Sequence, residues 1–345
     1  MKKAVILFNL GGPDSKKSIE PFLFNLFNDP EILSLPSIFR YPLAKLISKK
    51  RRPIAEKIYS EIGGSSPILK LTIDQSNALE KELNLNTKNN IFKCFVVMRC
   101  WHPRAKDVVN SVKKFNPDEI ILLPLYPQYS PATSGSSIKE WVEISKKNNL
   151  KKPTKTICCY PTNESFITSH TNLIKKKINN LINVKIIFSA HGLPERNIKK
   201  GDPYQWQIEQ SVKSTVENLR IKNLDWVLSY QSRVGPLKWI GPSTDDEIIK
   251  ASKENKTILL VPIAFVSEHS ETLVELDIEY KKLAEDNGCT NYHRVPALGT
   301  DQNFIKSLYQ LIINTNLGQG DKNGYFPPKN KCPNNFKKCP CSAKV

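Results

Sequence analysis

The sequence predicts an α/β protein built from two Rossmann-like domains, each a four-stranded parallel sheet flanked by helices. Apolar, β-branched runs recur along the chain, and most are continuous rather than alternating, as strands buried on both faces require. Helical patterns lie between these runs, and strand–helix alternation produces parallel sheets with right-handed crossovers. The length of 345 residues exceeds the usual size of one domain, which favours two similar domains.

Eight apolar runs are predicted as strands, four in each half of the chain. In order they are Ala4–Phe8, Ile91–Met98, Glu119–Leu125, Thr156–Tyr160, Val184–Phe188, Leu224–Ser229, Thr257–Ile263 and Asn291–Ala297. The helical patterns between them include Ile73–Leu83, Ala105–Phe115, Ser165–Ile182, Gln205–Asn218 and Glu271–Asn287. The third strand of each half ends with a proline and then a Ser-rich loop, which indicates a weak internal repeat of two doubly wound halves.

These patterns place an N-terminal domain at residues 1–160, a C-terminal domain at 161–317 and a cysteine-containing extension at 318–345. An insertion at about residues 10–90 separates the first two strands. It contains several prolines, so we expect a string of short helices and turns, from which pocket lids are often built. The extension is too polar to offset an ordering cost of roughly 1–2 kcal/mol per residue, so we expect it to be loose or fixed by something other than a hydrophobic core.

Composition and charge exclude several classes of protein. A hydrophobic content of 39% is enough for real cores, and no apolar run approaches the roughly 20 residues that a membrane-spanning helix needs. The net charge of +18 favours acidic partners, but many lysines lie in runs typical of solvated helix ends, and we see no nucleic-acid-binding motif. The apolar stretch Ala4–Phe8 is too short for the core of a secretion signal, so we expect a cytoplasmic protein that does not bind nucleic acid.

Two predicted strands are followed directly by residues that carry chemistry. The segment Ser189–Glu195 contains His191, and the segment Val266–Glu271 contains His269 and two carboxylates. In an open parallel sheet, ligands bind beyond the carboxyl ends of the strands. Imidazole and carboxylate would then face one another, which suits a divalent cation of intermediate softness. The alternative for His191 is a structural histidine that only makes hydrogen bonds.

Three glutamates follow at a spacing of four residues. Glu271, Glu275 and Glu279 would form a ridge along one helix face, with Leu273, Leu276 and Tyr280 on the buried side. Stacked like charges destabilise a helix unless cations or solvent compensate. Two readings stay open: a solvated surface, or a path of carboxylates that delivers a metal or removes protons.

The sequence resembles the ferrochelatase family, whose members insert Fe²⁺ into protoporphyrin IX in the last step of haem synthesis. The resemblance spans nearly the whole chain, and its motifs occur in order: Asn9–Pro13, Lys50–Pro53, Tyr59, Ile62–Pro67, Met98–Pro103, Leu123–Ser130, Ser134–Ser136, Ser189–Pro194, Tyr230–Pro236 with Trp239, and Glu268–Leu273. It implies two Rossmann-like domains and a porphyrin cleft, with protoporphyrin IX and Fe²⁺ as substrates.

The resemblance also implies roles for particular residues. His191 and Glu271 match the active-site pair, and which of them accepts protons stays open. Arg52, Tyr59 and Ser66 match positions that contact the porphyrin, whereas Cys100 stands where many members have an aromatic residue. The apolar insertion followed by Lys49–Arg52 suits a ligand that arrives from a membrane, so we expect peripheral membrane contact. A coproporphyrin III ferrochelatase, a cobalt or nickel chelatase and a non-catalytic iron- or haem-binding protein remain alternatives.

Eight cysteines are present, and three lie in the final 14 residues at Cys332, Cys339 and Cys341. Their spacing is not that of a typical zinc site. Three thiolates are one short of the four that a [2Fe–2S] cluster usually takes, and Cys158 or Cys159 could supply the other. Some ferrochelatases resemble this arrangement, and their bacterial pattern favours Cys158. The alternatives are an unliganded tail and a zinc site.

Overall fold

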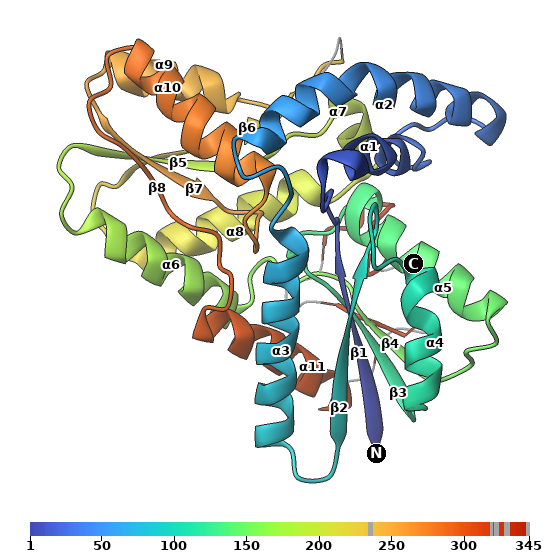
Figure 1. The fold of residues 1–345 in the computed structure, drawn as a ribbon. Coiled ribbons are helices and arrows are strands. Elements are labelled where there is room, and N and C mark those ends of the chain that lie inside the picture. The colour runs from blue at the N-terminus through green and yellow to red at the C-terminus, as the bar shows by residue number, and fades with distance from the viewer. Residues whose placement is uncertain (234–236, 318–319, 321–323, 328–331, 343–345) are drawn as a thin grey trace. The chain divides into compact units, whose positions relative to one another are not determined.

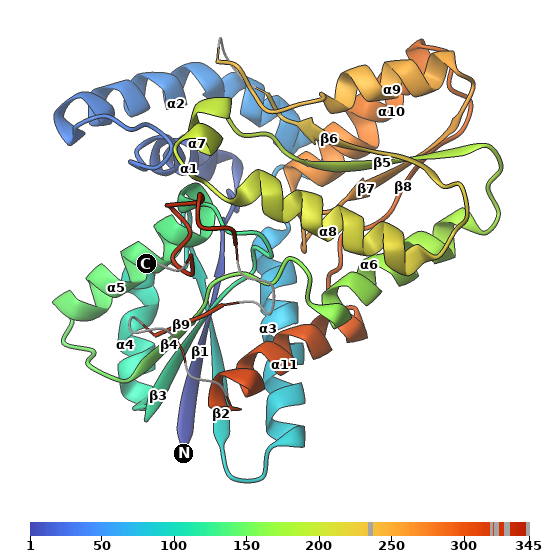
Figure 2. The ribbon, with the colours of Figure 1, turned by 180° about the vertical axis from the view of Figure 1, so that it is seen from behind.

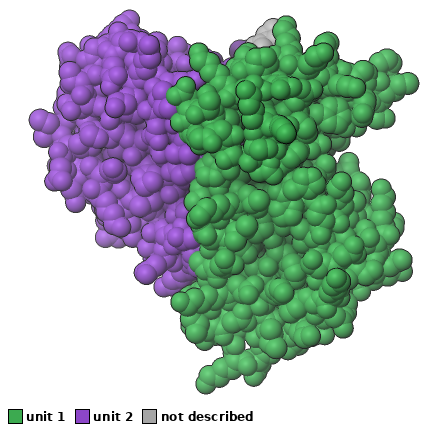
Figure 3. Space-filling model, viewed as in Figure 1, with its two compact units in different colours: residues 1–159, 308–327 green, residues 160–307, 328–345 purple. Residues whose placement is uncertain are grey.

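The structure is a computed structural model that describes residues 1–233, 237–317, 320, 324–327 and 332–342. Residues 234–236 of the motif Tyr230–Pro236 therefore lie outside the described residues. The chain divides into two compact units (Figure 3). The N-terminal unit comprises residues 1–159 and 308–327, and the C-terminal unit comprises residues 160–307 and 328–345.

The N-terminal unit contains a parallel sheet with the strand order β2-β1-β3-β4-β9. Its strands are β1 (Lys2–Asn9), β2 (Ile91–Met98), β3 (Glu119–Pro124), β4 (Thr154–Ile157) and β9 (Tyr325–Phe326). The sheet has one strand more than the four expected. β9 comes from the polar extension, and its two residues pair with Thr156 and Ile157 at the edge of the sheet.

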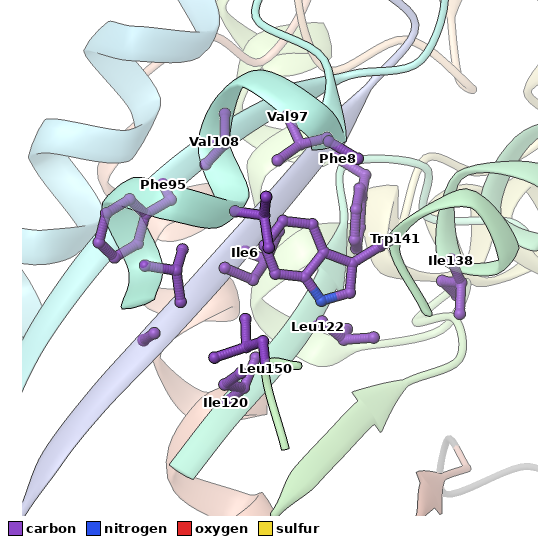
Figure 4. Packing of buried hydrophobic residues seen from close by; sticks show 14 residues of the cluster. Ile6, Phe8, Phe95, Val97, Val108, Ile120, Leu122, Ile138, Trp141 and Leu150 are labelled. Atoms are coloured by element: carbon purple, nitrogen blue, oxygen red, sulfur yellow. The ribbon is translucent and has the colours of Figure 1, made fainter. Parts of the chain in front are cut away.

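One face of this sheet packs under the helices α4 (Ala105–Phe115) and α5 (Ser136–Lys147). Alternate residues of β1, among them Ile6 and Phe8, point into the cluster shown in Figure 4. Phe8 meets the ring of Trp141 edge-on, with ring centroids 6.3 Å apart. The intervening Val5 and Leu7 are also fully buried. Burial on both faces explains why this strand is continuously apolar.

The insertion forms a 3₁₀ turn (Lys16–Ser18) and the helices α1 (Ile19–Phe27), α2 (Ser37–Ser60) and α3 (Ile68–Asn86). The expectation of short helices is wrong here, because α2 has 24 residues and contains Pro42 and Pro53. Each proline removes one backbone hydrogen bond, but both are surrounded by good helix formers, and α2 packs against α1.

The C-terminal unit contains a four-stranded parallel sheet of order β6-β5-β7-β8, as expected. Its strands are β5 (Val184–His191), β6 (Asp225–Gln231), β7 (Thr257–Pro262) and β8 (Tyr292–Arg294). The helices α6 (Glu164–Ile178) and α8 (Tyr204–Leu219) cover one face, and α9 (Thr244–Lys253) and α10 (Tyr280–Asp286) cover the other (Figures 1 and 2). Within β5, Ile186 and Phe188 pack toward the first pair and Ile187 toward the second.

The predicted helix Glu271–Asn287 is not a single α-helix. Residues Glu271–Glu279 are π-helical, and α10 begins at Tyr280. The wider turn of a π-helix is frequent at functional sites, and the apolar pattern of the sequence does not distinguish it from an α-helix. Along this segment Thr272, Val274 and Leu276 are buried, whereas Glu279 is exposed.

Three further elements are the π-helical turn Pro131–Gly135, α7 (Glu195–Lys199) and α11 (Gln302–Leu317). The described part of the tail from Cys332 to Ser342 packs near the turn after α7. There Lys338 donates its backbone N–H to the carbonyl of Gly201, and Phe336 contacts the ring of Trp206. Gly201 has a φ of +89°, and a Cβ on it would lie 2.8 Å from the backbone nitrogen of Lys337. Only glycine fits this close approach.

None of the helices in the described ranges is long and apolar enough to cross a membrane.

Candidate active site

The carboxyl ends of β5, β6 and β7 bring the candidate residues of the C-terminal unit together. His191 is the last residue of β5 and pairs with Gln231, the last residue of β6. Gly192 then donates its backbone N–H to the carbonyl of Gln231 at 2.9 Å. A Cβ on Gly192 would lie 3.0 Å from that same oxygen, so a glycine lets the two strand ends stay close beside the imidazole.

His191 presents one ring nitrogen toward Glu271. Its Nδ1 lies 2.7 Å from the carbonyl oxygen of Gly192, which can only accept, so Nδ1 carries the proton of that hydrogen bond. The other nitrogen, Nε2, lies 3.8 Å from Oε1 of Glu271. Burial alone would lower the pKa of His191, but the charges of Glu271 and Glu275 and the carbonyl of Gly192 outweigh it and raise the pKa.

Glu271 lies between two imidazoles. Its Oε2 is 3.8 Å from Nε2 of His269, and this oxygen is buried with no hydrogen-bond donor among the described residues. Nδ1 of His269 likewise has no hydrogen-bond partner there, and burial lowers the pKa of His269, so its imidazole is held neutral. The side chains of His191 and Glu271 remain 40% and 27% exposed, which leaves both within reach of a substrate.

This arrangement supplies nitrogen and oxygen donors that suit a divalent cation passing through as a substrate. It is not a closed metal cage. Within the described ranges, no group of three or more His, Cys, Asp and Glu side chains is arranged to hold a metal ion.

Glu275 is held by four hydrogen bonds. Its carboxylate accepts from Nε2 of Gln231 at 3.0 Å, from the backbone N–H and the hydroxyl of Ser232 at 2.9 and 2.5 Å, and from Oη of Tyr280 at 3.2 Å. Burial and the neighbouring charge of Glu271 nevertheless raise the pKa of Glu275 to about 7. Glu275 can therefore hold or release a proton near neutral pH.

Gln231 and Ser232 have roles here that sequence reasoning missed. Ser189 donates a hydrogen bond to Oε1 of Gln231 at 2.7 Å, which directs the amide N–H₂ of Gln231 toward Glu275. Ser232 has a φ of +59°, in the left-handed region that non-glycine residues rarely adopt. The available signal was that this pair comes just after a third predicted strand, Leu224–Ser229.

A partly buried ion-pair network supports the same segment. Arg294 of β8 binds Asp277 through two nitrogens, each 2.6 Å from a carboxylate oxygen, and it also binds Glu268 at 2.9 Å. Burial would raise the pKa of Glu268, but the guanidinium of Arg294 outweighs it and lowers the pKa. Because Glu268 and Asp277 flank Glu271 and Glu275 in the sequence, this network holds the π-helical segment at both sides of the candidate residues.

The three residues matched to porphyrin contacts all belong to the N-terminal unit. Arg52 is half-exposed and binds Glu20 and Glu56. Tyr59 is only 6% exposed and packs in a cluster with Ile19, Phe22, Leu23, Ala55 and Cys100. Ser66 donates its backbone N–H to the carbonyl of Pro13 at 2.7 Å.

Each unit has a cavity. The cavity in the N-terminal unit, about 470 Å³, is lined by Lys17, Glu20, Pro21, Phe24, Tyr41, Lys45, Ser48 and Arg52. The cavity in the C-terminal unit is larger, about 810 Å³, and lies between α6 and the segment 296–303. His191, Glu271 and Glu275 do not line the larger cavity, so volume alone does not identify the chemistry of this unit.

Cys94, Cys100, Cys289 and Cys341 are free thiols. Cys332, Cys339 and Cys341 are 8% exposed or less, although they lie in a polar segment. Nε2 of Gln207 donates a hydrogen bond to Sγ of Cys332 at 3.1 Å. Cys158 follows β4 in the N-terminal unit and is fully buried.

Comparison with known proteins supplies independent findings. The family model described as Ferrochelatase matches residues 2–316. The chain is 70% identical to a ferrochelatase of Pelagibacter ubique (strain HTCC1062), with 99% of each chain covered. It is 56% identical to a ferrochelatase of Wolbachia sp. subsp. Drosophila simulans (strain wRi), covering 91% of this chain and 99% of the relative.

Solved structures confirm the fold class. The structure of SirB from Bacillus subtilis with Fe³⁺ matches with a TM-score of 0.55 at 10% identity, covering 91% of this chain and 95% of the other. The sirohydrochlorin chelatase SirB in complex with cobalt, from subspecies spizizenii, matches over the same shares with a TM-score of 0.52 and the same identity. At such low identity these structures show the fold alone.

The sequence motifs, the family model over residues 2–316 and relatives that align over nearly their full length agree. The chain belongs to the ferrochelatase family.

Proposed function

We propose that this protein is an enzyme, a metal-chelating lyase that inserts Fe²⁺ into protoporphyrin IX and releases two protons, the last step of haem synthesis. The observation that carries the proposal is the pair formed by Nε2 of His191 and the carboxylate of Glu271, 3.8 Å apart and accessible to substrate. Membership of the family supports it, because the relatives at 70% and 56% identity are themselves ferrochelatases.

The reaction needs a proton acceptor and a group that meets the metal. In the neutral imidazole of His191, Nε2 has the free lone pair, because Nδ1 carries the ring proton, so we assign it the pyrrole protons. Glu271 has a carboxylate oxygen without a hydrogen bond, so we assign it the incoming Fe²⁺. Both oxygens of Glu275 already accept hydrogen bonds, which favours a proton outlet over a step of metal delivery.

The N-terminal unit would bind the porphyrin. Arg52 supplies a half-exposed cation suited to a propionate, and Tyr59 and Ser66 complete the set of proposed contacts. Helix α2 and the residues before it expose Leu35, Ile38, Phe39, Tyr41 and Leu46, and Lys49–Arg52 follow. Apolar side chains beside a basic cluster suit peripheral contact with an anionic membrane. Co-sedimentation with anionic vesicles tests this contact, and binding that Phe39→Glu leaves unchanged would contradict it.

We propose a cytoplasmic location and a [2Fe–2S] cluster held by Cys158, Cys332, Cys339 and Cys341. The free thiols of Cys94, Cys100, Cys289 and Cys341 suit a reducing compartment. All four residues have the thiol that such a cluster takes as ligand, and all four are buried. Among the described residues, however, they are not gathered into a group that could hold a metal ion. A bound cluster would supply ligation energy in place of a hydrophobic core.

One comparison of substrates tests the function. The purified protein is assayed anaerobically with Fe²⁺, Co²⁺, Ni²⁺ and Zn²⁺, each with protoporphyrin IX and with coproporphyrin III. We expect the highest turnover with Fe²⁺ and protoporphyrin. A preference for coproporphyrin III or for another metal would show that the protein is a chelatase of a different specificity. Binding of porphyrin without release of a metalloporphyrin would indicate a binding protein.

The first prediction concerns the central pair. His191→Ala should lower turnover by roughly 10²-fold or more, because general acid–base groups contribute on that order. Glu271→Gln should act similarly, since it removes the charge at nearly constant shape. His293→Ala and the exposed Glu279→Gln are matched controls that should stay near wild type. Near-wild-type turnover of either active-site variant would remove that residue from the mechanism.

The second prediction concerns Glu275. Glu275→Gln should slow turnover less than Glu271→Gln does and leave porphyrin affinity unchanged. Stability should also respond to pH. The raised pKa of Glu275 means that the folded state binds its proton more tightly than the unfolded state, so wild type loses stability as pH rises through about 7. The glutamine of the variant stays neutral at both pH values. Thermal unfolding measured at about pH 5.5 and about pH 8 should therefore show that the stability of Glu275→Gln relative to wild type is greater at the higher pH. A difference that does not change with pH would contradict the assignment.

The third prediction concerns the tail. Protein purified anaerobically should contain about two irons and two acid-labile sulfides per chain and be reddish-brown. Cys339→Ser should remove the colour and the sulfide and make the tail more sensitive to protease, whereas Cys289→Ser, at another buried thiol, should keep both. Colourless wild-type protein without sulfide after reconstitution would exclude the cluster.

A further inference from the structure

Tyr280 connects the buried carboxylate of Glu275 to the surface of the C-terminal unit. It is the first residue of α10 and is only 4% exposed. Its hydroxyl lies 3.2 Å from Oε1 of Glu275 and 3.3 Å from Oδ2 of Asp245. Asp245 is exposed on the first turn of α9. The phenol therefore touches an inner carboxylate and an outer one.

A phenol hydroxyl carries one proton, so it can donate to only one of these two carboxylates at a time. When Glu275 is ionised, Tyr280 can donate to it. When Glu275 is protonated, its own O–H can donate to the oxygen of Tyr280, and the hydroxyl of Tyr280 is then free to donate to Asp245. The same three groups thus have two complete hydrogen-bond arrangements, and the proton on Glu275 selects between them.

We propose that Tyr280 and Asp245 form a proton exit, through which the proton held by Glu275 leaves the active site for bulk solvent. In the step, the O–H bond of Glu275 breaks as its proton passes to the lone pair of the Tyr280 oxygen. The O–H bond of Tyr280 breaks at the same time, and its proton passes to the carboxylate of Asp245, which gives it to water. Tyr280 ends neutral, and no electron is gained or lost.

The surroundings favour such a paired transfer over a phenolate intermediate. Burial and the charges of Glu275 and Asp245 raise the pKa of Tyr280 far above its usual value, so an isolated phenolate is unfavourable. On the inner side Glu275 faces Glu271 and His191, and Ser232 and Gln231 hold its carboxylate. On the outer side the neighbouring Asp246 accepts a hydrogen bond from Ser243 and pairs with Arg233, so Asp245 is the carboxylate that accepts from Tyr280.

This inference rests on the proposed function and goes beyond it by naming the route of the protons. The experiment measures Fe²⁺ insertion by wild type, Tyr280→Phe and Asp245→Asn while the concentration of a non-coordinating morpholine buffer is raised at constant pH and ionic strength. Asp286→Asn, an exposed residue of α10 with the same chemical change, is the matched control.

In dilute buffer, both exit variants should turn over roughly tenfold more slowly than wild type, since proton transfer by a positioned group contributes at least on this order. Concentrated buffer should restore most of the loss, because a small molecule can then carry the proton. The double variant should be no slower than the slower single variant. Wild type and Asp286→Asn should not respond to the buffer.

Three outcomes would overturn the inference: Asp245→Asn turning over like wild type, losses that buffer does not restore, or additive losses. A defect limited to Tyr280→Phe would show that Tyr280 only positions Glu275. Wild type that inserts no metal at all would instead refute the proposed function.

An infrared measurement tests the exit without turnover. The stretching band of protonated Glu275, assigned by its absence in Glu275→Gln, should move to higher frequency in Tyr280→Phe, because the phenol oxygen no longer accepts from it. An unmoved band would show that this hydrogen bond does not form and would overturn the relay.

Discussion

The repulsion between Glu271 and Glu275 is the interaction on which the rest of the C-terminal unit depends. Two carboxylates in a partly buried site destabilise each other, and burial together with this repulsion raises the pKa of Glu275. The donors of Gln231, Ser232 and Tyr280 offset it on one side, and the imidazole of His191 offsets it on the other. These donors bind Glu275 and not Glu271, whose buried Oε2 has no hydrogen-bond donor among the described residues. The same repulsion therefore separates the roles of two chemically identical side chains: one is free to meet a cation, and the other is poised to hold a proton.

Parallel strands make this compensation possible. The ends of β5, β6 and β7 lie at one edge of the sheet, so residues about 40 positions apart in the sequence reach the same carboxylate. The wider π-helical turn of Glu271–Glu279 then keeps both glutamates near that edge, and Arg294 ties down its neighbours Glu268 and Asp277. Each hydrogen bond is worth only about 1 kcal/mol, so the precision of the site comes from many fixed partners rather than one strong contact.

Much of this organisation is predictable from the sequence, and the failures have physical causes. The predicted two-sheet fold and the predicted family are confirmed. Both could be predicted because continuous apolar strands and motifs in a fixed order are strong signals over a long chain. The meeting of His191 with Glu271 follows from two strand ends. Gln231 and Ser232 were missed as partners of Glu275 because they lie more than 40 residues away in the sequence, and the backbone N–H that Ser232 donates at a positive φ leaves no side-chain pattern. The length of α2 was missed because proline was weighed as a terminator and packing against α1 was not. β9 was missed because two residues are too few to show a period.

That short strand has a consequence for how the protein is made. β4 pairs with β9 about 170 residues later in the chain, so the last strand of the first sheet is synthesised only after residues 160–307 of the C-terminal unit. At roughly 5–20 residues per second, the ribosome needs several seconds to tens of seconds to cover that distance. Throughout this interval the outer edge of β4 has backbone groups without their final partner, and an open edge is where one chain pairs with another. The N-terminal unit thus begins first but is completed only after residues 160–307 of the C-terminal unit, which makes the nascent chain a natural client for chaperones that shield open sheet edges.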